Sequence, residues 1–390
     1  MTFSHLFSEL ELRTVRLRNR VVVSPMWQYE GRDGFPTDWH LMHLGRYADG
    51  GAGLVFQEGT TVERRGRGTL GDLGIWDDRF IDPLNRLVRV IRNNGSVPGI
   101  QLMHAGRKAR MSTPMDGRRP LERTPEIADW DEWHPIAPSA IPVREGQEAP
   151  RAMTTEEVQD VVSSFVAAAA RAQRAGYDVV EVHSGHGYLL HQFLSEATNH
   201  RTDRYGGSYE NRTRALKEIV EGVRAVWPDD KPLFVRLSVD DFAGWSVDES
   251  VRLAGQLRTM GVDVVDCSSG GLVGSPTEGG TYSYGYQVDY AAELKRRSGV
   301  ATMAVGLIVH PELAERIVAE GSADLVAIGR EVLYNPNWPL DAAVKLGIDD
   351  PYAITSPRTA YWLRRRGETV PGLVPSTFTD GQGGAKPSPH

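Results

Sequence analysis

The stretch VEVHSGHGYLLHQFL places two histidines, His183 and His186, three positions apart and a tyrosine, Tyr188, two positions later. Imidazole nitrogens can bind a metal ion, a phosphate or the oxygen of an organic substrate. The spacing alone does not distinguish these three kinds of site. A metal site also needs a third ligand and an unprotonated nitrogen on each ring. The choice therefore depends on the side chains that the fold brings beside the two histidines.

Eight short apolar runs alternate with helical patterns along the chain. The runs span residues 19–26, 53–60, 97–106, 177–184, 232–238, 262–270, 300–306 and 323–330. Helices are expected between them, over residues 155–175, 208–228, 246–261 and 310–321 among others. The first of these has a Thr154 cap, an acidic first turn and a Gly176 stop. Eight strands with helical crossovers predict an α/β fold, a (β/α)₈ TIM barrel. A doubly wound open sheet is the alternative, but no GxGxxG motif follows the first run.

Two segments do not follow this alternation. Residues 107–153 are rich in Pro, Arg and Trp and follow the third predicted strand, so we expect an insertion that caps the catalytic face. The barrel pattern is complete by about residue 345, and we expect a single domain over residues 1–366 that includes a C-terminal extension. Residues 367–390 are rich in Gly and Pro, which predicts a disordered tail.

The overall charge and the apolar pattern exclude several classes of protein. The chain has 44 Lys and Arg against 51 Asp and Glu, a net charge of −7, without basic blocks. This balance argues against nucleic acid and anionic membrane surfaces as partners. No segment has the length and apolarity of a membrane span, and the first residues lack a signal-peptide pattern, so we expect a cytoplasmic protein. The single cysteine, Cys267, excludes an intramolecular disulfide and is expected to be a small core residue.

Polar residues and glycines collect at the ends of the predicted strands, where a barrel places its chemistry. They are Ser24, Gln101, His183, His186 and Arg236, with Gly306, Gly329 and Arg330 after the last two strands. Glycines there let backbone N–H groups approach an anion, so the last three residues predict a phosphate site; each glycine alone is equally typical of a turn or a cap. Strand one carries Ser24-Pro25-Met26 in place of the His-x-His of metal-dependent barrel hydrolases. We therefore predict no metal at the two histidines.

A longer motif resembles a known family. RTDRYGGSYENRTRAL (201–216), preceded by HSGHGYLLHQFLS, is similar to the signature of the Old Yellow Enzyme family of FMN-dependent ene-reductases. RNRVVVSPM, GAGLVFQEGTTV, QLMHAGRKA, VRLS, AVGLI and AIGRE lie in the expected order, and the resemblance covers roughly residues 5–345. The HAGRKA segment is similar to the bacterial thermophilic-like (YqjM-type) branch. The resemblance implies noncovalent FMN, NAD(P)H as reductant and a small-molecule acceptor.

The resemblance also implies roles for the candidate residues. Gln101 and Arg236 would contact the polar edge of the flavin, and Gly306, Gly329 and Arg330 would hold its phosphate. The residues expected against the ring are Ser24, Pro25, Met26, Trp27 and Gly59. His183 and His186 would bind the oxygen of an activated alkene, and stabilise charge that develops there. Tyr188 would protonate the α-carbon, and Tyr29 would contact substrate or cofactor.

Two features depart from that pattern or extend it. Trp27 stands where the branch commonly has a cysteine, and its indole would either narrow the pocket or turn away and pack. The segment TAYWLRRR (359–366) resembles a C-terminal region that reaches a neighbouring subunit's site. We therefore expect Trp362 to contact substrate in a homodimer or homotetramer; the alternative is a solvated helix end. Two other functions stay open: a flavin-dependent desaturase or oxidase, and a metal-dependent barrel hydrolase.

Overall fold

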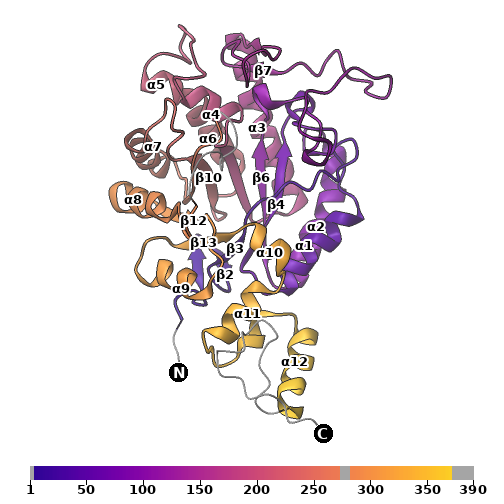
Figure 1. Ribbon diagram of the computed structural model, residues 1–390, viewed down its shortest axis with the longest axis vertical. Coiled ribbons are helices and arrows are strands. Elements are labelled where there is room, and N and C mark those ends of the chain that lie inside the picture. Colours follow the sequence, from indigo (N-terminus) through magenta and orange to yellow (C-terminus); the bar gives the residue numbers. More distant parts are fainter. Residues whose placement is uncertain (1–3, 273–281, 371–390) are drawn as a thin grey trace.

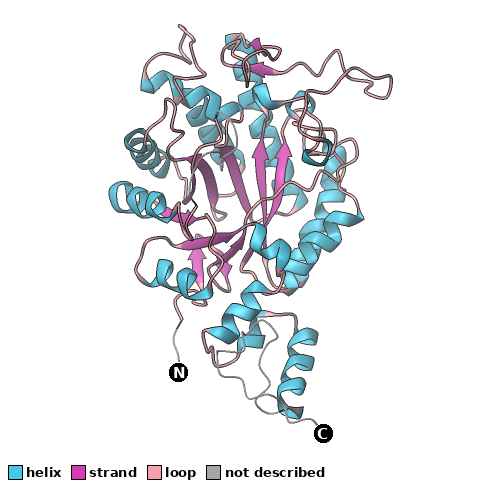
Figure 2. Ribbon diagram, in the orientation of Figure 1, coloured by secondary structure: helices cyan, strands magenta, loops and turns pink. Residues whose placement is uncertain are grey.

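The computed structural model describes residues 4–272 and 282–370, in which eight parallel strands form a closed barrel surrounded by helices (Figures 1 and 2). The strands are β3 (Val21–Val23), β4 (Leu54–Thr61), β6 (Val97–Met103), β9 (Val179–Ser184), β10 (Leu233–Ser238), β11 (Val264–Ser268), β12 (Ala301–Ala304) and β13 (Leu325–Ile328). They pair in the order β3, β13, β12, β11, β10, β9, β6 and β4, and pairing of β3 with β4 closes the ring. Every strand falls on one of the eight predicted runs, so the expected TIM barrel is confirmed.

The barrel strands are almost entirely buried, because helices cover their outer faces and side chains fill the interior. All six residues of β9, for example, are buried. An antiparallel hairpin that the sequence pattern does not predict, β1 (Leu10–Leu12) and β2 (Val15–Leu17), packs against apolar side chains such as Phe56 and Val179. These side chains lie near the starts of the strands. The hairpin therefore covers the amino-terminal end of the barrel and leaves the opposite end for chemistry.

Helices follow the barrel strands and cover the outside. They are α1 (Asp38–Asp49), α2 (Ile81–Asn93), α3 (Thr155–Ala175), α4 (Leu189–Leu194), α5 (Tyr209–Arg212), α6 (Arg214–Val226), α7 (Val247–Thr259), α8 (Val288–Ser298) and α9 (Pro311–Ala319). Helix α3 has the predicted Thr154 capping box and the left-handed Gly176 stop. The helix expected over residues 208–228 is instead divided into α5 and α6 at Thr213. The Thr213 hydroxyl bonds back to the Tyr209 carbonyl at 2.9 Å, a contact that bends helices.

The predicted insertion, residues 107–153, lies over the carboxyl ends of the strands in Figure 1, and we call it the cap. It contains the short strand β7 (Ile136–Ala137), which pairs with β8 (Arg151–Ala152); another short strand, β5 (Leu73–Gly74), pairs with β4. Trp133 anchors the cap. Its buried indole donates to the Arg67 carbonyl at 3.1 Å, and the Arg67 guanidinium lies 4.3 Å from the ring centroid.

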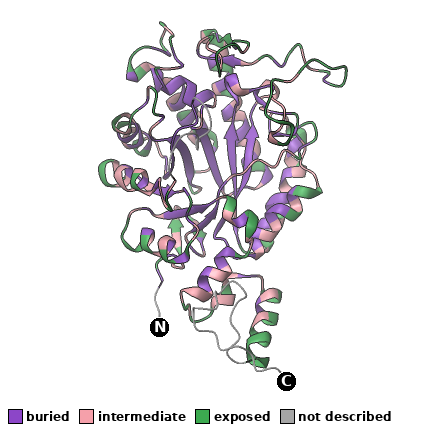
Figure 3. Cartoon of the chain, in the orientation of Figure 1, coloured by how far each residue is buried: buried purple, intermediate pink, exposed green. Residues whose placement is uncertain are grey.

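The C-terminal extension comprises α10 (Arg330–Tyr334), α11 (Trp338–Lys345) and α12 (Pro357–Thr369). Helices α11 and α12 lie at the opposite end of the barrel from the cap, and α12 is largely exposed (Figures 1 and 3). Helix α12 begins after the Ser356 cap and continues to Thr369, three residues beyond the predicted boundary of the domain, so residues 367–369 are helical where a disordered tail is expected. Residues 371–390 of the expected tail lie outside the described residues. No helix within residues 4–272 and 282–370 is long and apolar enough to cross a membrane.

Candidate active site

The turn after β9 places the two histidines and the tyrosine together. His186 and Gly187 both have positive φ angles, 55° and 71°, and Tyr188 then caps α4. A Cβ atom at Gly187 would lie 2.4 Å from the Gly271 carbonyl oxygen, so only glycine fits there. A non-glycine residue such as His186 in this backbone region costs of order 1 kcal/mol or more. The fold therefore holds His186 in a strained conformation at the carboxyl end of the barrel.

The three side chains lie in contact. His183 Nε2 and His186 Nδ1 are 3.4 Å apart, and the His183 and Tyr188 rings have their centroids 5.3 Å apart. His186 Nε2 also lies 2.7 Å from the Ser268 hydroxyl, at the end of β11. Burial, and secondly the nearby Arg236 charge, lowers the pKa of both histidines well below the ordinary value. Both imidazoles are therefore neutral at physiological pH, and each has one N–H to donate.

Tyr188 keeps its hydroxyl proton at physiological pH. Burial, more than any neighbouring charge, raises the pKa of its phenol above the usual value. The ring stands edge-on to the Trp27 indole, with centroids 5.0 Å apart. The geometry thus offers a protonated phenol beside two neutral imidazoles.

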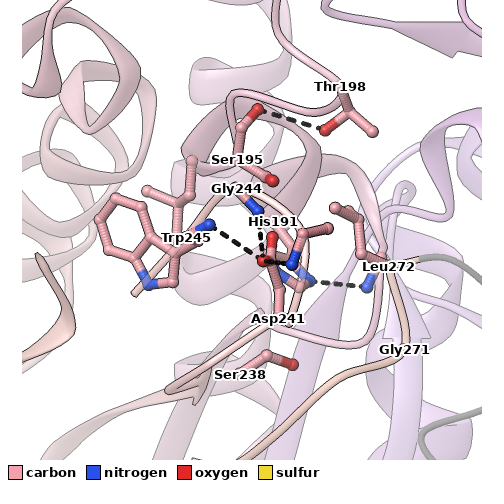
Figure 4. Close-up of polar contacts among 12 residues, drawn as sticks. His191, Ser195, Thr198, Ser238, Asp241, Gly244, Trp245, Gly271 and Leu272 are labelled. Carbon is pink, nitrogen blue, oxygen red and sulfur yellow. Dashed lines mark hydrogen bonds and ion pairs between the residues drawn. The ribbon is translucent and has the colours of Figure 1, made fainter. Parts of the chain in front are cut away.

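A buried His191–Asp241 pair holds the turn after β9 that carries His186 and Gly187 (Figure 4). The Gly187 N–H donates to His191 Nδ1 at 2.8 Å, so the hydrogen of the neutral ring is on Nε2 and faces Asp241 Oδ2 at 3.5 Å. Asp241 Oδ1 accepts from three consecutive backbone N–H groups, of Ala243, Gly244 and Trp245, at 2.7–2.9 Å. The pair therefore connects the loop after β10 to the left-handed turn that holds His186.

A layer of buried polar side chains lies at the ends of neighbouring strands. Arg236 is the register partner of both His183 and Asp266, and its Nε is 3.0 Å from the Asp266 carboxylate. Arg236 also donates to the Ser24 hydroxyl at 3.3 Å. Gln101 donates to Glu181 at 2.8 Å, and burial, with a smaller effect from Asp266, raises the pKa of Glu181 to about 8. This layer thus contains the fixed positive charge of Arg236. It also contains the carboxyl group of Glu181, which is mostly protonated at neutral pH.

This arrangement fits FMN. His183 Nδ1 and Glu181 Oε2 are buried without a hydrogen-bond partner, which is costly for a polar atom unless a bound group satisfies it. A Cβ atom at Gly329 would meet nothing closer than the Met26 sulfur at 3.9 Å, so the backbone there is open to a close neighbour. Arg330 follows it, exposed and without an ion-pair partner in the described part of the chain. A flat polar ring at the strand ends, with its phosphate at Gly306, Gly329 and Arg330, is compatible with these groups.

Trp27 points into the site, which decides between the two alternatives left open by the sequence. Its Nε1–H donates to the Gly59 carbonyl at 2.8 Å, and a Cβ atom at Gly59 would lie 3.0 Å from the indole ring. The Trp27 indole thus packs directly against Gly59, a residue expected beside the flavin. The indole and Tyr188 together narrow the base of the cavity.

A cavity of about 460 Å³ lies between this base and the cap. Its lining includes Trp27, Tyr29 and Tyr188 from the barrel side and Lys108 from the start of the cap. The volume suits a small or medium-sized organic molecule. Tyr29, expected to contact substrate, lines this cavity.

Lys108 is a site residue that the sequence reasoning missed, although it stands within the QLMHAGRKA motif. Its ammonium donates to the carbonyl oxygens of His186 at 2.7 Å and Gly271 at 2.5 Å, and lies 5.4 Å from the Tyr188 ring centroid. Asp266 was missed too. Its carboxylate directly after the apolar pair Val264-Val265, inside a predicted strand, is the pattern that could have identified it, because a buried charge in a strand needs a partner.

The other predicted residues have the following positions. Cys267 is fully buried in the core, as expected. Trp362 is on α12, 70% exposed, and thus at the opposite end of the barrel from the cavity of its own chain. Among residues 4–272 and 282–370, no group of three or more His, Cys, Asp or Glu side chains is arranged to hold a metal ion.

Comparison with known proteins places the chain in a family. The model described as the NADH:flavin oxidoreductase / NADH oxidase family matches residues 5–348. An NADPH dehydrogenase of Bacillus cytotoxicus is 44% identical over 355 residues, covering 90% of this chain and 95% of that protein. The solved structure of morphinone reductase has a TM-score of 0.73 at 28% identity, covering 92% of this chain and 93% of its own.

A 2-naphthoyl-CoA reductase in complex with 2-naphthoyl-CoA has a TM-score of 0.77 at 26% identity over 90% of this chain, which spans 53% of that longer protein. Barrel, site geometry and full-length similarity agree. The chain therefore belongs to the NADH:flavin oxidoreductase / NADH oxidase family, the Old Yellow Enzyme family that its sequence resembles, and uses FMN with NAD(P)H as reductant.

Proposed function

We propose that the protein reduces the activated C=C bond of α,β-unsaturated carbonyl or related compounds. The observation that carries this proposal is the pair of neutral imidazoles, His183 and His186, facing each other at 3.4 Å beside the protonated Tyr188. Family membership supports the flavin chemistry and leaves the metal-dependent hydrolase without support. Bound FMN, once reduced by NAD(P)H, supplies the hydride.

The protein residues act on the other atoms of the acceptor. With its hydrogen on Nε2, His183 would have an N–H to donate, and so would His186 with its hydrogen on Nδ1. These two nitrogens lie 3.4 Å apart, so one carbonyl or nitro oxygen could accept from both. Negative charge that develops on this oxygen strengthens both hydrogen bonds, and losing one such donor typically costs roughly 3–4 kcal/mol in the transition state. Tyr188 then delivers its hydroxyl proton to the α-carbon.

The direction of the reaction is tested under strictly anaerobic conditions. The holoenzyme is reduced with one equivalent of NADPH and mixed with 2-cyclohexenone, while the visible absorbance of the flavin is followed and the product is identified. We expect complete reoxidation and one equivalent of cyclohexanone. Cyclohexanone, which has no C=C bond to reduce, serves as the control and should leave the flavin reduced. Flavin that stays reduced with every activated alkene and reoxidises only in air would instead support the oxidase or desaturase alternative.

We also propose the finer classification and the assembly. The QLMHAGRKA segment favours the thermophilic-like branch, and the composition favours a cytoplasmic enzyme. Trp362 and Tyr361 are 70% and 55% exposed and stack edge-to-face on α12. Exposed aromatic pairs of this kind are typical of protein interfaces. Because α12 lies far from the cavity of its own chain, Trp362 can contact substrate only in a homo-oligomer, as a residue contributed to a neighbouring subunit.

A further inference from the structure

Positive charges line the cavity on its cap side. The cap contributes Lys108, Arg118 and Arg144. Two other cap arginines form ion pairs: Arg110 with Glu148 at 3.0 Å, and Arg123 with Asp131 at 2.8 Å. Within the described ranges, neither Arg118 nor Arg144 has a carboxylate within ion-pair distance. Two unpaired guanidinium groups thus face the same cavity.

The cap is built to present Arg118. Gly117 and Arg118 have positive φ angles of 90° and 51°, which reverse the chain. Reciprocal bonds fix the turn, since the Ser112 N–H donates to the Arg119 carbonyl at 2.8 Å and the Arg119 N–H donates to the Ser112 hydroxyl at 2.9 Å. The Arg118 guanidinium lies within hydrogen-bonding reach of the Tyr29 hydroxyl on the cavity wall. The turn therefore directs this side chain inward.

The segment that carries Arg144 is held on the other side. The Arg107 guanidinium donates to the Pro142 carbonyl at 3.2 Å and to the Leu272 carbonyl at 2.7 Å. These bonds tie the chain just before Val143 and Arg144 to the loop after β11. Val143, Arg144 and Gln147 all line the cavity.

The one acidic residue among the lining side chains, Asp72, forms no ion pair with Arg118 or Arg144. Asp72 accepts from the Gly68 N–H and the Thr69 hydroxyl, both at 2.6 Å, and burial raises its pKa. The excess of positive charge also affects the pKa of Lys108. Burial, followed by the charges of Arg107, Arg118 and Arg144, lowers the pKa of Lys108 to about 7. An anion bound near these groups would relieve this repulsion.

We infer that the cap binds an oxyanion: Arg118 and Arg144 hold a carboxylate or phosphate at the end of the ligand remote from the group bound by His183 and His186. Guanidinium groups bind both anions through paired N–H donors. The inference rests on the proposed function and adds the substrate class, an acidic acceptor. The same chemistry could instead serve the phosphate of NADPH, since both ligands must reach the flavin.

The test compares the binding of a carboxylate ligand with the binding of its uncharged methyl ester. Isothermal titration calorimetry on the holoenzyme measures Kd for 3-(4-hydroxyphenyl)propanoate and for its methyl ester. The proteins compared are the parent and the double variant Arg118→Gln/Arg144→Gln. Arg119→Gln, outside the cavity, is the matched control. The rate of flavin reduction is measured against NADPH and NADH concentration in the same proteins.

We expect the double variant to bind the acid about tenfold more weakly, the ester unchanged, and Arg119→Gln to match the parent; the estimate allows for the partial solvent exposure of both arginines. Loss confined to the acid identifies the acceptor's carboxylate as the anion, whereas loss that also affects NADPH but not NADH identifies a phosphate. Unchanged Kd values for the acid together with unchanged NADPH saturation would overturn the inference. Calorimetry needs no turnover, so arginine-dependent binding of the acid in a protein that reduces no alkene would contradict only the proposed function.

Discussion

At the scale of single residues, the hydrogen on His186 decides whether the site can bind an acceptor oxygen. His186 can present Nδ1–H toward that oxygen when its Nε2 is unprotonated, and a hydrogen bond donated to Nε2 stabilises this tautomer. The Ser268 hydroxyl, 2.7 Å from Nε2, can donate it. The Ser268 hydroxyl could instead donate to Gln287 Oε1, but this oxygen is farther away, at 3.3 Å, and already accepts from the Ser269 hydroxyl at 2.7 Å. Ser268 thus acts as a positioning residue that selects the productive tautomer.

Ser268→Ala removes this hydrogen bond while keeping the buried volume nearly constant. We expect kcat/KM for alkene reduction to fall about fivefold, equivalent to roughly 1 kcal/mol, while flavin reduction by NAD(P)H is little changed. The variant should also bind phenols more weakly in a spectral titration. Ser269→Ala is the matched control, since its hydroxyl bonds Gln287 and does not touch His186. Parental phenol binding and parental kcat/KM in Ser268→Ala would show that Ser268 does not position His186.

At the scale of elements, the turn between β9 and α4 depends on a loop from the neighbouring strand. Asp241 uses one oxygen for three backbone N–H groups and directs the other at His191, which in turn accepts from Gly187. Asn at position 241 cannot reproduce this, because its NH₂ group would face either the three N–H donors or the His191 N–H. We expect Asp241→Asn to lower the free energy of unfolding by about 2–4 kcal/mol, measured by urea denaturation.

If Asp241 only stabilises the fold, Asp241→Asn changes stability alone. If Asp241 also positions His186, the substitution has a second effect. Asp241→Asn should weaken phenol binding even under conditions in which the variant is fully folded with FMN bound. Ser163→Ala, on the exposed side of α3, provides a folding control. Full phenol affinity in folded Asp241→Asn would show that the pair stabilises the fold without orienting His186.

Helix α1 carries a histidine that makes the fold sensitive to acid. Burial, and secondly Arg46, lowers the pKa of His43 from 6.5 to about 3. Below pH 6.5 the unfolded chain therefore binds a proton that the native state excludes, so this residue's contribution to stability is lost as the pH falls from 6.5 toward 3. His43→Gln keeps an acceptor for Arg46 but does not titrate. Relative to its value at pH 8, its free energy of unfolding at pH 5 should fall about 2 kcal/mol less than that of the parent. Parallel pH profiles in urea denaturation would contradict this.

At the scale of the whole molecule, the exposed α12 predicts assembly. Trp362→Ala should shift the size-exclusion profile toward smaller species or raise KM for the acceptor, with FMN content unchanged, because the indole would lose its apolar partner on another subunit. Arg366→Gln, on the same exposed helix, is the control for charge alone. A Trp362→Ala protein with parental elution and parental KM for every acceptor tried would show that α12 belongs to the surface of its own subunit.

How much the sequence predicts differs between the parts of this architecture. The barrel was predictable because strands buried on both faces appear as continuous apolar runs, and residues at their carboxyl ends, such as His183 and Arg236, must converge. The hairpin β1–β2 and the division at Thr213 follow from packing and a single hydroxyl, which leave no periodic pattern. Arg118 and Arg144 line the same cavity only because the cap folds back over the barrel, which is a tertiary property.

The central claim is that Tyr188 is the proton donor in alkene reduction. The most direct measurement is anaerobic stopped-flow of the two half-reactions in Tyr188→Phe, with Tyr29→Phe as the control that removes a hydroxyl from the same cavity. The account predicts that flavin reduction by NADPH stays within about twofold of the parent, while reoxidation by 2-cyclohexenone slows about a hundredfold or more in Tyr188→Phe and little in Tyr29→Phe. Parental reoxidation in Tyr188→Phe, or equal slowing of both half-reactions, would contradict it.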